Sequence, residues 1–114
     1  MASFEDLEVW KRAVKLSVDV YKVLRDLGDY GFRDQITRAG LSIPSNITEG
    51  MELESKAQKL RHLTIAKGSC GELRTQAIIG MEIGYINRES GQRWVQETRE
   101  ISAMLVGLRR NLKY

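Results

Sequence analysis

The sequence holds very few of the residues that interrupt helices, form disulfides or bind metals. Its 114 residues include one proline, one cysteine and one histidine. A single cysteine excludes an intrachain disulfide and fits a reducing compartment. No apolar run approaches the roughly 18 residues that a membrane span requires, and the N-terminal MASFEDLEVW lacks the layout of a signal peptide. We therefore expect a cytoplasmic protein that does not enter the membrane.

The residue groupings of catalytic and metal sites are absent as well. His62 and Cys70 stand apart in the sequence, and neither belongs to an HExxH or CxxC motif. There is no Gly-x-Ser-x-Gly turn and no glycine-rich phosphate loop. We interpret His62 as a surface or cap-side residue and Cys70 as a small buried apolar residue. The sequence predicts that the protein is not an enzyme and binds no metal, cofactor or small-molecule substrate.

Periodic apolar residues and capping patterns divide the chain into four predicted helices. We expect helices over residues 6–27, 35–50 and 55–84. The third opens with a Ser-x-x-Gln capping box, and Asn87 is the expected cap of the fourth. The sequence shows no strand pattern and no internal repeat. It predicts an all-α up-down four-helix bundle that forms a single domain over residues 1–114.

The predicted third helix carries apolar residues on two faces. One face is a seam rich in small residues: Leu63, Ala66, Cys70, Leu73, Ala77, Gly80 and Gly84. The other face carries Ile65, Ile79 and Ile83. A helix in a four-helix bundle needs one buried stripe, so the second face predicts contact with another copy of the chain. We expect a homo-oligomer with these isoleucines in its interface.

The predicted first helix separates an apolar face from a basic face. Its inward residues are expected to be Val9, Trp10, Ala13, Val14, Ser17, Val20, Tyr21, Leu24 and Leu27. The candidate phosphate contacts on the opposite side are Lys11, Lys15, Lys22 and Arg25, with Arg12 at the margin. Few exposed aromatic residues are expected beside them, so base stacking is not predicted and selectivity for single-stranded RNA is expected to be weak.

A solvated surface is the alternative interpretation of this basic face. Asp19 and Asp26 lie four residues beyond Lys15 and Lys22, a spacing that allows ion pairs along a helix. The net charge of +3 permits a polyanionic partner without requiring one.

The segment from Gln35 to Gly50 combines an apolar stripe with an adjacent polar stripe. The apolar stripe consists of Ile36, Ala39, Gly40, Ile43, Ile47 and Gly50. Pro44 lies in the middle, where its missing backbone donor is expected to bend or loosen the helix. We expect the Asn46 side chain to cover a carbonyl that Pro44 frees.

The polar stripe is interpreted as part of a hydrogen-bonded network that fixes the register of two helices. The predicted network consists of Gln35, Arg38, Ser42, Asn46, Glu49, Ser69 and Glu72. Within it, Arg38 has two carboxylate candidates, Glu49 and Glu72. Ser42 is expected to bond back to the carbonyl of Arg38. The alternative is that the same residues form a ligand or RNA-contact pocket.

Three motifs resemble the signature of the bacterial four-helix bundle proteins called 23S rRNA intervening-sequence proteins. The motifs are Phe4-x-Asp6-Leu7-x-Val9-Trp10, Gln35-x-x-Arg38-Ala39-x-x-Ser42-Ile43-Pro44-x-Asn46-Ile47-x-Glu49-Gly50 and Ala66-x-Gly68-Ser69-x-x-Glu72-Leu73. The resemblance covers nearly the whole chain, although Gly40 and Cys70 stand where the family commonly has other residues. It implies a ring-shaped homopentamer and supplies no catalytic residues. The family is also similar to accessory proteins of diversity-generating retroelements, basic pentameric barrels that bind a reverse transcriptase and nucleic acid.

These observations together predict a non-enzymatic oligomeric module. Its expected partners are other copies of itself and RNA, or an RNA–protein complex, bound through the basic surface. The alternative is a protein-only interaction or scaffold module with no role in nucleic-acid binding. The two differ in salt dependence, because phosphate binding weakens steeply with ionic strength and apolar docking does not.

Overall fold

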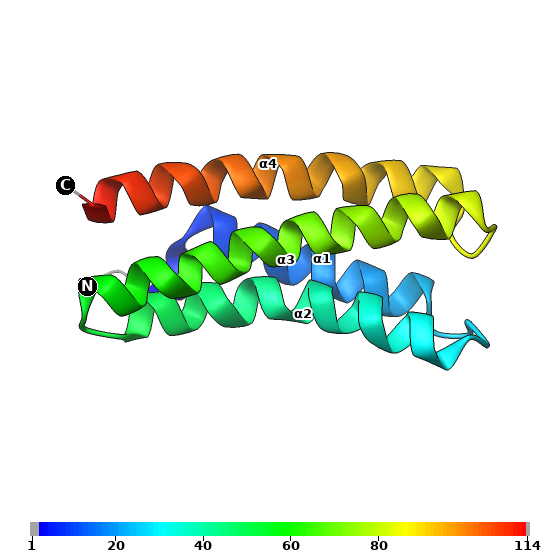
Figure 1. Cartoon of the computed structure of the whole chain (residues 1–114), viewed down its shortest axis with the longest axis horizontal. Coiled ribbons are helices and arrows are strands. Elements are labelled where there is room, and N and C mark those ends of the chain that lie inside the picture. The colour runs from blue at the N-terminus through cyan, green and yellow to red at the C-terminus, as the bar shows by residue number, and fades with distance from the viewer. Residues whose placement is uncertain (1–2, 114) are drawn as a thin grey trace.

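Four antiparallel helices account for most of the chain. The structure, a computed structural model, describes residues 3–113. The helices run alternately up and down along the longest dimension of the molecule, 44 Å (Figure 1). In chain order, the elements are η1 (a 3-10 helix, Phe4–Asp6), α1 (Glu8–Val23), α2 (Tyr30–Glu52), α3 (Lys56–Glu82) and α4 (Arg88–Lys113). The predicted all-α up-down bundle is confirmed, and residues 3–113 contain no strand.

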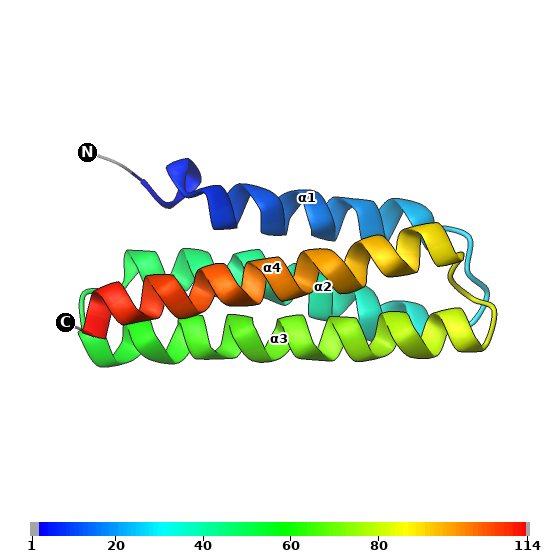
Figure 2. The same ribbon diagram turned by 90° about the horizontal axis from the view of Figure 1, so that it is seen from above.

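Each helix packs against two neighbours. α1 contacts α2 and α4, and α3 contacts the same two helices. Figure 2 shows α1 and α3 at opposite edges of the bundle, with α2 and α4 between them. α1 packs more extensively against α2 than against α4. α1 is therefore an edge helix with a wide outer face.

The core is formed by apolar residues from all four helices. The largest fully buried side chains are Val20, Leu24, Ile36, Ile43, Ile47, Leu63, Cys70, Leu73, Trp94, Thr98, Ile101 and Leu105. Every residue of the predicted apolar stripe of α2 is buried. The predicted seam of α3 is buried from Leu63 to Gly80, whereas Gly84 is exposed in the turn after the helix. Gly84 has a φ of 78°, which side chains disfavour, so glycine suits this turn.

The buried face of α1 differs from the prediction at two positions. Tyr21 was expected to face inward, but 46% of its surface is exposed. Leu16 is buried instead. The buried face turns toward Leu16 because α1 packs against α4 as well as α2.

α1 is also shorter than the predicted helix over residues 6–27. Ser3 and Asp6 form a capping box around η1, which occupies the start of the expected helix. The chain then becomes extended at Leu7 before α1 begins at Glu8. At the other end, the helix stops at Val23, ahead of the Gly-containing turn.

Side-chain caps start the other three helices. Asp29 Oδ1 accepts a hydrogen bond of 3.1 Å from the N–H of Phe32, and α2 therefore begins earlier than predicted. Ser55 Oγ accepts one of 3.4 Å from the backbone N–H three residues later. Asn87 Oδ1 accepts the equivalent bond at 2.8 Å. Ser55 and Asn87 are therefore confirmed as the caps of α3 and α4, but the return bond of the predicted capping box, from the backbone of Ser55 to the Gln58 side chain, does not form within residues 3–113.

Candidate functional site

The outer face of α1 and the turn that follows carry a row of cations. Lys11, Lys15, Lys22 and Arg25 are all exposed. Because a helix rises 1.5 Å per residue, Lys11 and Lys22 are about 16 Å apart along the helix axis. Within residues 3–113, none of the four has a carboxylate oxygen within 4.0 Å. We call these four residues the basic row.

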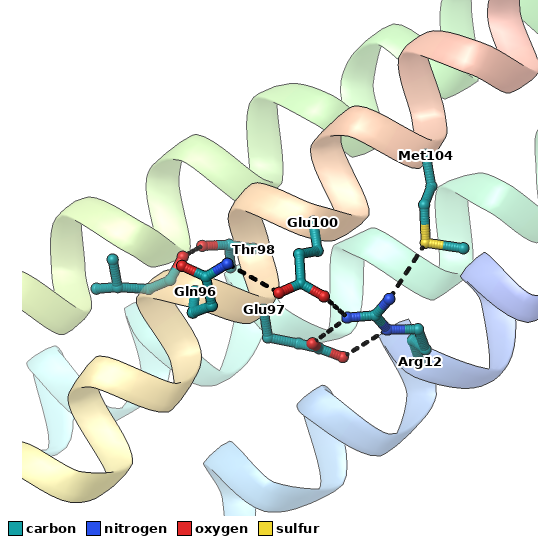
Figure 3. A network of polar contacts seen from close by, with 7 residues as sticks. Arg12, Gln96, Glu97, Thr98, Glu100 and Met104 are labelled. Carbon is teal, nitrogen blue, oxygen red and sulfur yellow. Dashed lines mark hydrogen bonds and ion pairs between the residues drawn. The ribbon is translucent and has the colours of Figure 1, made fainter.

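Arg12 does not belong to the basic row. Its guanidinium forms ion pairs with Glu97 and Glu100 of α4 (Figure 3), and its Nε donates a further hydrogen bond of 3.0 Å to Glu97 Oε2. The bonds to Glu97 and then to Glu100 raise the pKa of Arg12 above its ordinary value. The prediction that Arg12 contacts phosphate is wrong, because its side chain turns toward α4 and joins the two helices.

Asp19 also pairs across the bundle. Its Oδ2 accepts hydrogen bonds of 2.7 Å from the indole N–H of Trp94 and from Nη2 of Arg93. Partial burial by itself raises the pKa of Asp19, but the bonds from Trp94 and Arg93 outweigh it and bring the pKa below its ordinary value. The expected ion pair with Lys15 does not form. Lys15 therefore keeps its charge available at the surface.

Two solvent-open grooves flank Lys22. The first lies between α1 and α4, has a volume of about 450 Å³, and is lined by Lys15, Leu16, Val18, Asp19, Lys22, Arg93, Trp94 and Glu97. The second lies between α1 and α2, has a volume of about 370 Å³, and is lined by Tyr21, Lys22, Arg25, Arg33, Asp34 and Thr37. We call the second the α1–α2 groove. Three of its lining residues are cations, Lys22, Arg25 and Arg33, and Asp34 is the only lining residue with a carboxylate.

Sequence reasoning identified Lys22 and Arg25 as site residues but not the other lining residues of the α1–α2 groove, among them Tyr21 and Arg33. Tyr21 was assigned to the core, but it is half exposed and lines the groove. Arg33 was not singled out, although its guanidinium carbon lies 4.7 Å from the centre of the Tyr30 ring. The three-residue spacing of Tyr30 and Arg33 places them on one helix face and is the signal that would have found the pair.

The α2–α3 contact holds a chain of polar side chains. Ser42 Oγ and Ser69 Oγ are 2.9 Å apart, and Asn46 Nδ2 donates to Ser42 Oγ at 3.0 Å. Asn46 Oδ1 lies 2.9 Å from His62 Nδ1, which is also 3.2 Å from Glu49 Oε2. The structure thus joins four of the predicted network residues. His62, which was expected at the surface or near a cap, is half-buried and links Asn46 to Glu49.

The remaining network residues are arranged differently from the prediction. Gln35 and Arg38 are exposed, and neither makes a side-chain hydrogen bond or ion pair within residues 3–113. Glu72 is exposed too and accepts only a long hydrogen bond, 3.5 Å, from Gln76. The expected pairing of Arg38 with a carboxylate is wrong for the single chain, because the outer edge of the α2–α3 contact faces solvent.

The polar groups around Pro44 also differ from expectation. α2 continues through Pro44 without interruption, and the proline is buried. Asn46 Nδ2 donates at 2.9 Å to the carbonyl of Ser42 rather than to the carbonyl four residues before the proline. Ser42 directs its hydroxyl across to α3 instead of back along its own helix.

The second apolar face of α3 is exposed. Ile65, Ile79 and Ile83 have 38%, 47% and 53% of their surface accessible. Ile78, on another side of the helix, is 44% exposed. The structure therefore leaves the three predicted interface isoleucines without a partner among residues 3–113, on the side of α3 that borders its contact with α2.

The structure places the single cysteine in the core and shows how the possible metal ligands of residues 3–113 are distributed. Cys70 is fully buried, and burial raises the pKa of its thiol to about 12 against the smaller opposite effects of Arg74 and Lys67. Residues 3–113 contain no cluster of three or more His, Cys, Asp or Glu side chains placed to hold a metal ion. In the same range, no helix is long and apolar enough to cross a membrane.

Comparisons with other proteins place the fold among known relatives. The family model described as 23S rRNA-intervening sequence protein matches residues 5–107. The chain also resembles a crystal structure described as a protein with unknown function from the S23 ribosomal protein family of Bacteroides thetaiotaomicron VPI-5482. The two share 26% sequence identity with a TM-score of 0.82, over 89% of this chain and 97% of that one. No curated protein matches the sequence.

Proposed function

This chain belongs to the 23S rRNA-intervening sequence protein family, and we propose that it is a non-enzymatic oligomeric module that binds RNA, or an RNA–protein complex, in the bacterial cytoplasm. The basic row carries this proposal. Its four cations share one open face and have no carboxylate partner within the described chain. Phosphate groups suit such a surface because each contact releases counterions from the nucleic acid.

The binding mode is electrostatic and independent of base sequence. Lys11, Lys15, Lys22 and Arg25 are the proposed phosphate contacts. Lysine and arginine that reach phosphates set affinity and position, whereas sequence is read through base edges. The described basic row offers point charges on a convex helix, so we expect it to supply affinity rather than sequence discrimination.

Oligomerisation increases the number of these contacts. We propose that the exposed Ile65, Ile79 and Ile83 pack against another copy of the chain, and that the assembly is a ring-shaped homopentamer. α3 lies across the bundle from α1 (Figure 2), so an interface on α3 does not cover the basic row of the same subunit. Each added subunit repeats the basic row and raises the effective concentration of cations around a bound strand.

A protein-only docking module is the second candidate function. The exposed isoleucines of α3 favour it, since apolar side chains of this size also suit a partner protein. Under this alternative the basic row is solvated surface and takes no part in binding.

Binding of the purified protein to a labelled structured RNA across a salt series distinguishes the two functions. RNA binding predicts that the logarithm of the association constant falls linearly with the logarithm of salt concentration, with a slope of about −0.7 to −0.9 for each phosphate neutralised. Absence of binding at low salt contradicts the proposed function and leaves the docking module.

A further inference from the structure

The α1–α2 groove concentrates positive charge at one end of the basic row. Lys22, Arg25 and Arg33 line it, and Asp34 is its only acidic lining residue. Lys22 and Arg25 make no side-chain hydrogen bond and no ion pair within residues 3–113. Their charges therefore remain available to an anionic ligand.

Arg33 is held in place for such a ligand. Its Nη1 donates a hydrogen bond of 3.1 Å to the carbonyl of Arg25, and its guanidinium lies over the Tyr30 ring at 4.7 Å. A guanidinium has five N–H donors. One of them satisfies the Arg25 carbonyl, and the others stay free to bind phosphate oxygens without the entropic cost of ordering a mobile side chain.

Tyr21 adds an aromatic surface to the same groove. Tyr21 has 46% of its surface exposed, and no hydrogen bond holds its hydroxyl within the described residues. Aromatic rings beside a basic groove are the stacking platforms of proteins that bind single-stranded nucleic acid. Bases in a duplex are already stacked on one another, so they are not available to such a ring.

We propose that the α1–α2 groove binds single-stranded RNA, with a base stacked on Tyr21 and the adjoining phosphates held by Lys22, Arg25 and Arg33. This inference rests on the proposed RNA-binding function and narrows it to one site and one form of RNA. The groove volume of about 370 Å³ falls within the range of pockets that hold small organic ligands, so it has room for a nucleotide. The proposal departs from the expectation that base stacking plays no part and that selectivity for single-stranded RNA is weak. That expectation placed Tyr21 in the core, whereas Tyr21 is exposed.

Tyrosine variants separate stacking from charge. The probes are a labelled oligouridylate, which stays single-stranded, and a labelled RNA hairpin of similar length. We expect the wild-type protein to prefer the oligouridylate. We expect Tyr21→Leu to weaken its binding by about 5- to 100-fold, the range for loss of one stacked base, and Tyr21→Phe to bind like the wild type. Far-ultraviolet circular dichroism checks that both variants are folded.

Charge variants locate the phosphates. Arg33→Met and Lys22→Met should each weaken binding. Each should also make the salt slope shallower by the amount expected for the loss of about one phosphate contact. Lys56→Met is the matched control, because Lys56 is an exposed cation at the start of α3. The lining residues place the groove where α1 ends and α2 begins, and these helix ends lie at the opposite end of the bundle from the start of α3 (Figure 1). We expect Lys56→Met to retain the wild-type affinity.

The outcomes distinguish this inference from the proposed function beneath it. Equal binding of hairpin and oligouridylate, or unchanged affinity in Tyr21→Leu and Arg33→Met while Lys11→Met weakens binding, overturns the α1–α2 groove but leaves RNA binding through the rest of the basic row. Failure of the wild-type protein to bind either RNA overturns both.

Discussion

The buried indole of Trp94 donates a 2.7 Å hydrogen bond to the carboxylate of Asp19, which links the core of α4 to the surface of α1. With Asp19 in place Trp94 is fully buried, and Asp19 is the only hydrogen-bond acceptor of its indole N–H within residues 3–113. The same carboxylate holds Arg93 at 2.7 Å. Asp19 is therefore a structural residue, and its charge is used within the bundle.

Two substitutions at Asp19 test this role. Asp19→Ala leaves the indole N–H unpaired and should lower the free energy of unfolding by about 1–3 kcal/mol. Asp19→Asn retains a carbonyl acceptor for Trp94 and should lose less stability. Urea unfolding followed by tryptophan fluorescence measures both. Equal stability of the wild type and the alanine variant would show that the indole bond is not needed.

Arg12 and Lys15 are predicted to have opposite roles although they lie one turn apart on α1. Arg12→Met breaks the ion pairs to Glu97 and Glu100 and should reduce stability by about 1 kcal/mol without weakening RNA binding. Lys15→Met removes an unpaired surface charge and should weaken RNA binding with stability unchanged. Thermal unfolding and RNA titration of the two proteins supply the comparison. The assignment fails if Arg12→Met loses as much RNA affinity as Lys15→Met.

The folded protein should resist thiol reagents. Cys70 is fully buried and its pKa is raised to about 12, so very little thiolate is present at neutral or mildly alkaline pH. A thiol-specific colorimetric reagent should react slowly with native protein and rapidly after denaturation. Rapid labelling of the folded protein would contradict the burial of this side chain.

The isoleucine face of α3 is predicted to hold subunits together. Ile79→Glu places a charge within the proposed interface and should shift the protein from oligomer to monomer in light scattering. Ile78→Glu is the matched control, since Ile78 is the adjacent residue with similar exposure on another side of α3. We expect the control to keep the wild-type mass. A wild-type protein with a monomeric mass in solution would contradict the proposed oligomer.

Local patterns in the sequence predicted much of the fold. The apolar stripe of α2 has the helical period and is buried along its length, for instance at Ile36 and Ile47. Ser55 and Asn87 cap helices because their side chains bond to backbone groups only three residues away. Such interactions depend on neighbouring residues, so they are visible in the sequence.

The candidate site was harder to predict than the fold, because it depends more on contacts between residues that are distant in the sequence. Arg12 and Glu97 are separated by 85 positions, and no local pattern relates them. Tyr21 lies at the border of the buried face of α1, where a small rotation of the helix decides whether the ring is covered. The basic row was predicted as a group because four exposed cations follow a simple helical spacing. The packing of α1 on α2 and α4 determines which other side chains lie next to the basic row, and the sequence pattern does not show that packing.

If the basic row binds RNA phosphates, removing its charges must change how RNA binding depends on salt. The measurement is the salt dependence of RNA binding for the wild type and for a variant with Lys11, Lys15, Lys22 and Arg25 all changed to Gln. Phosphate binding through the basic row predicts a much shallower slope for the variant, smaller by roughly 0.7–0.9 for each lost phosphate contact. Identical slopes and affinities for the two proteins would contradict it.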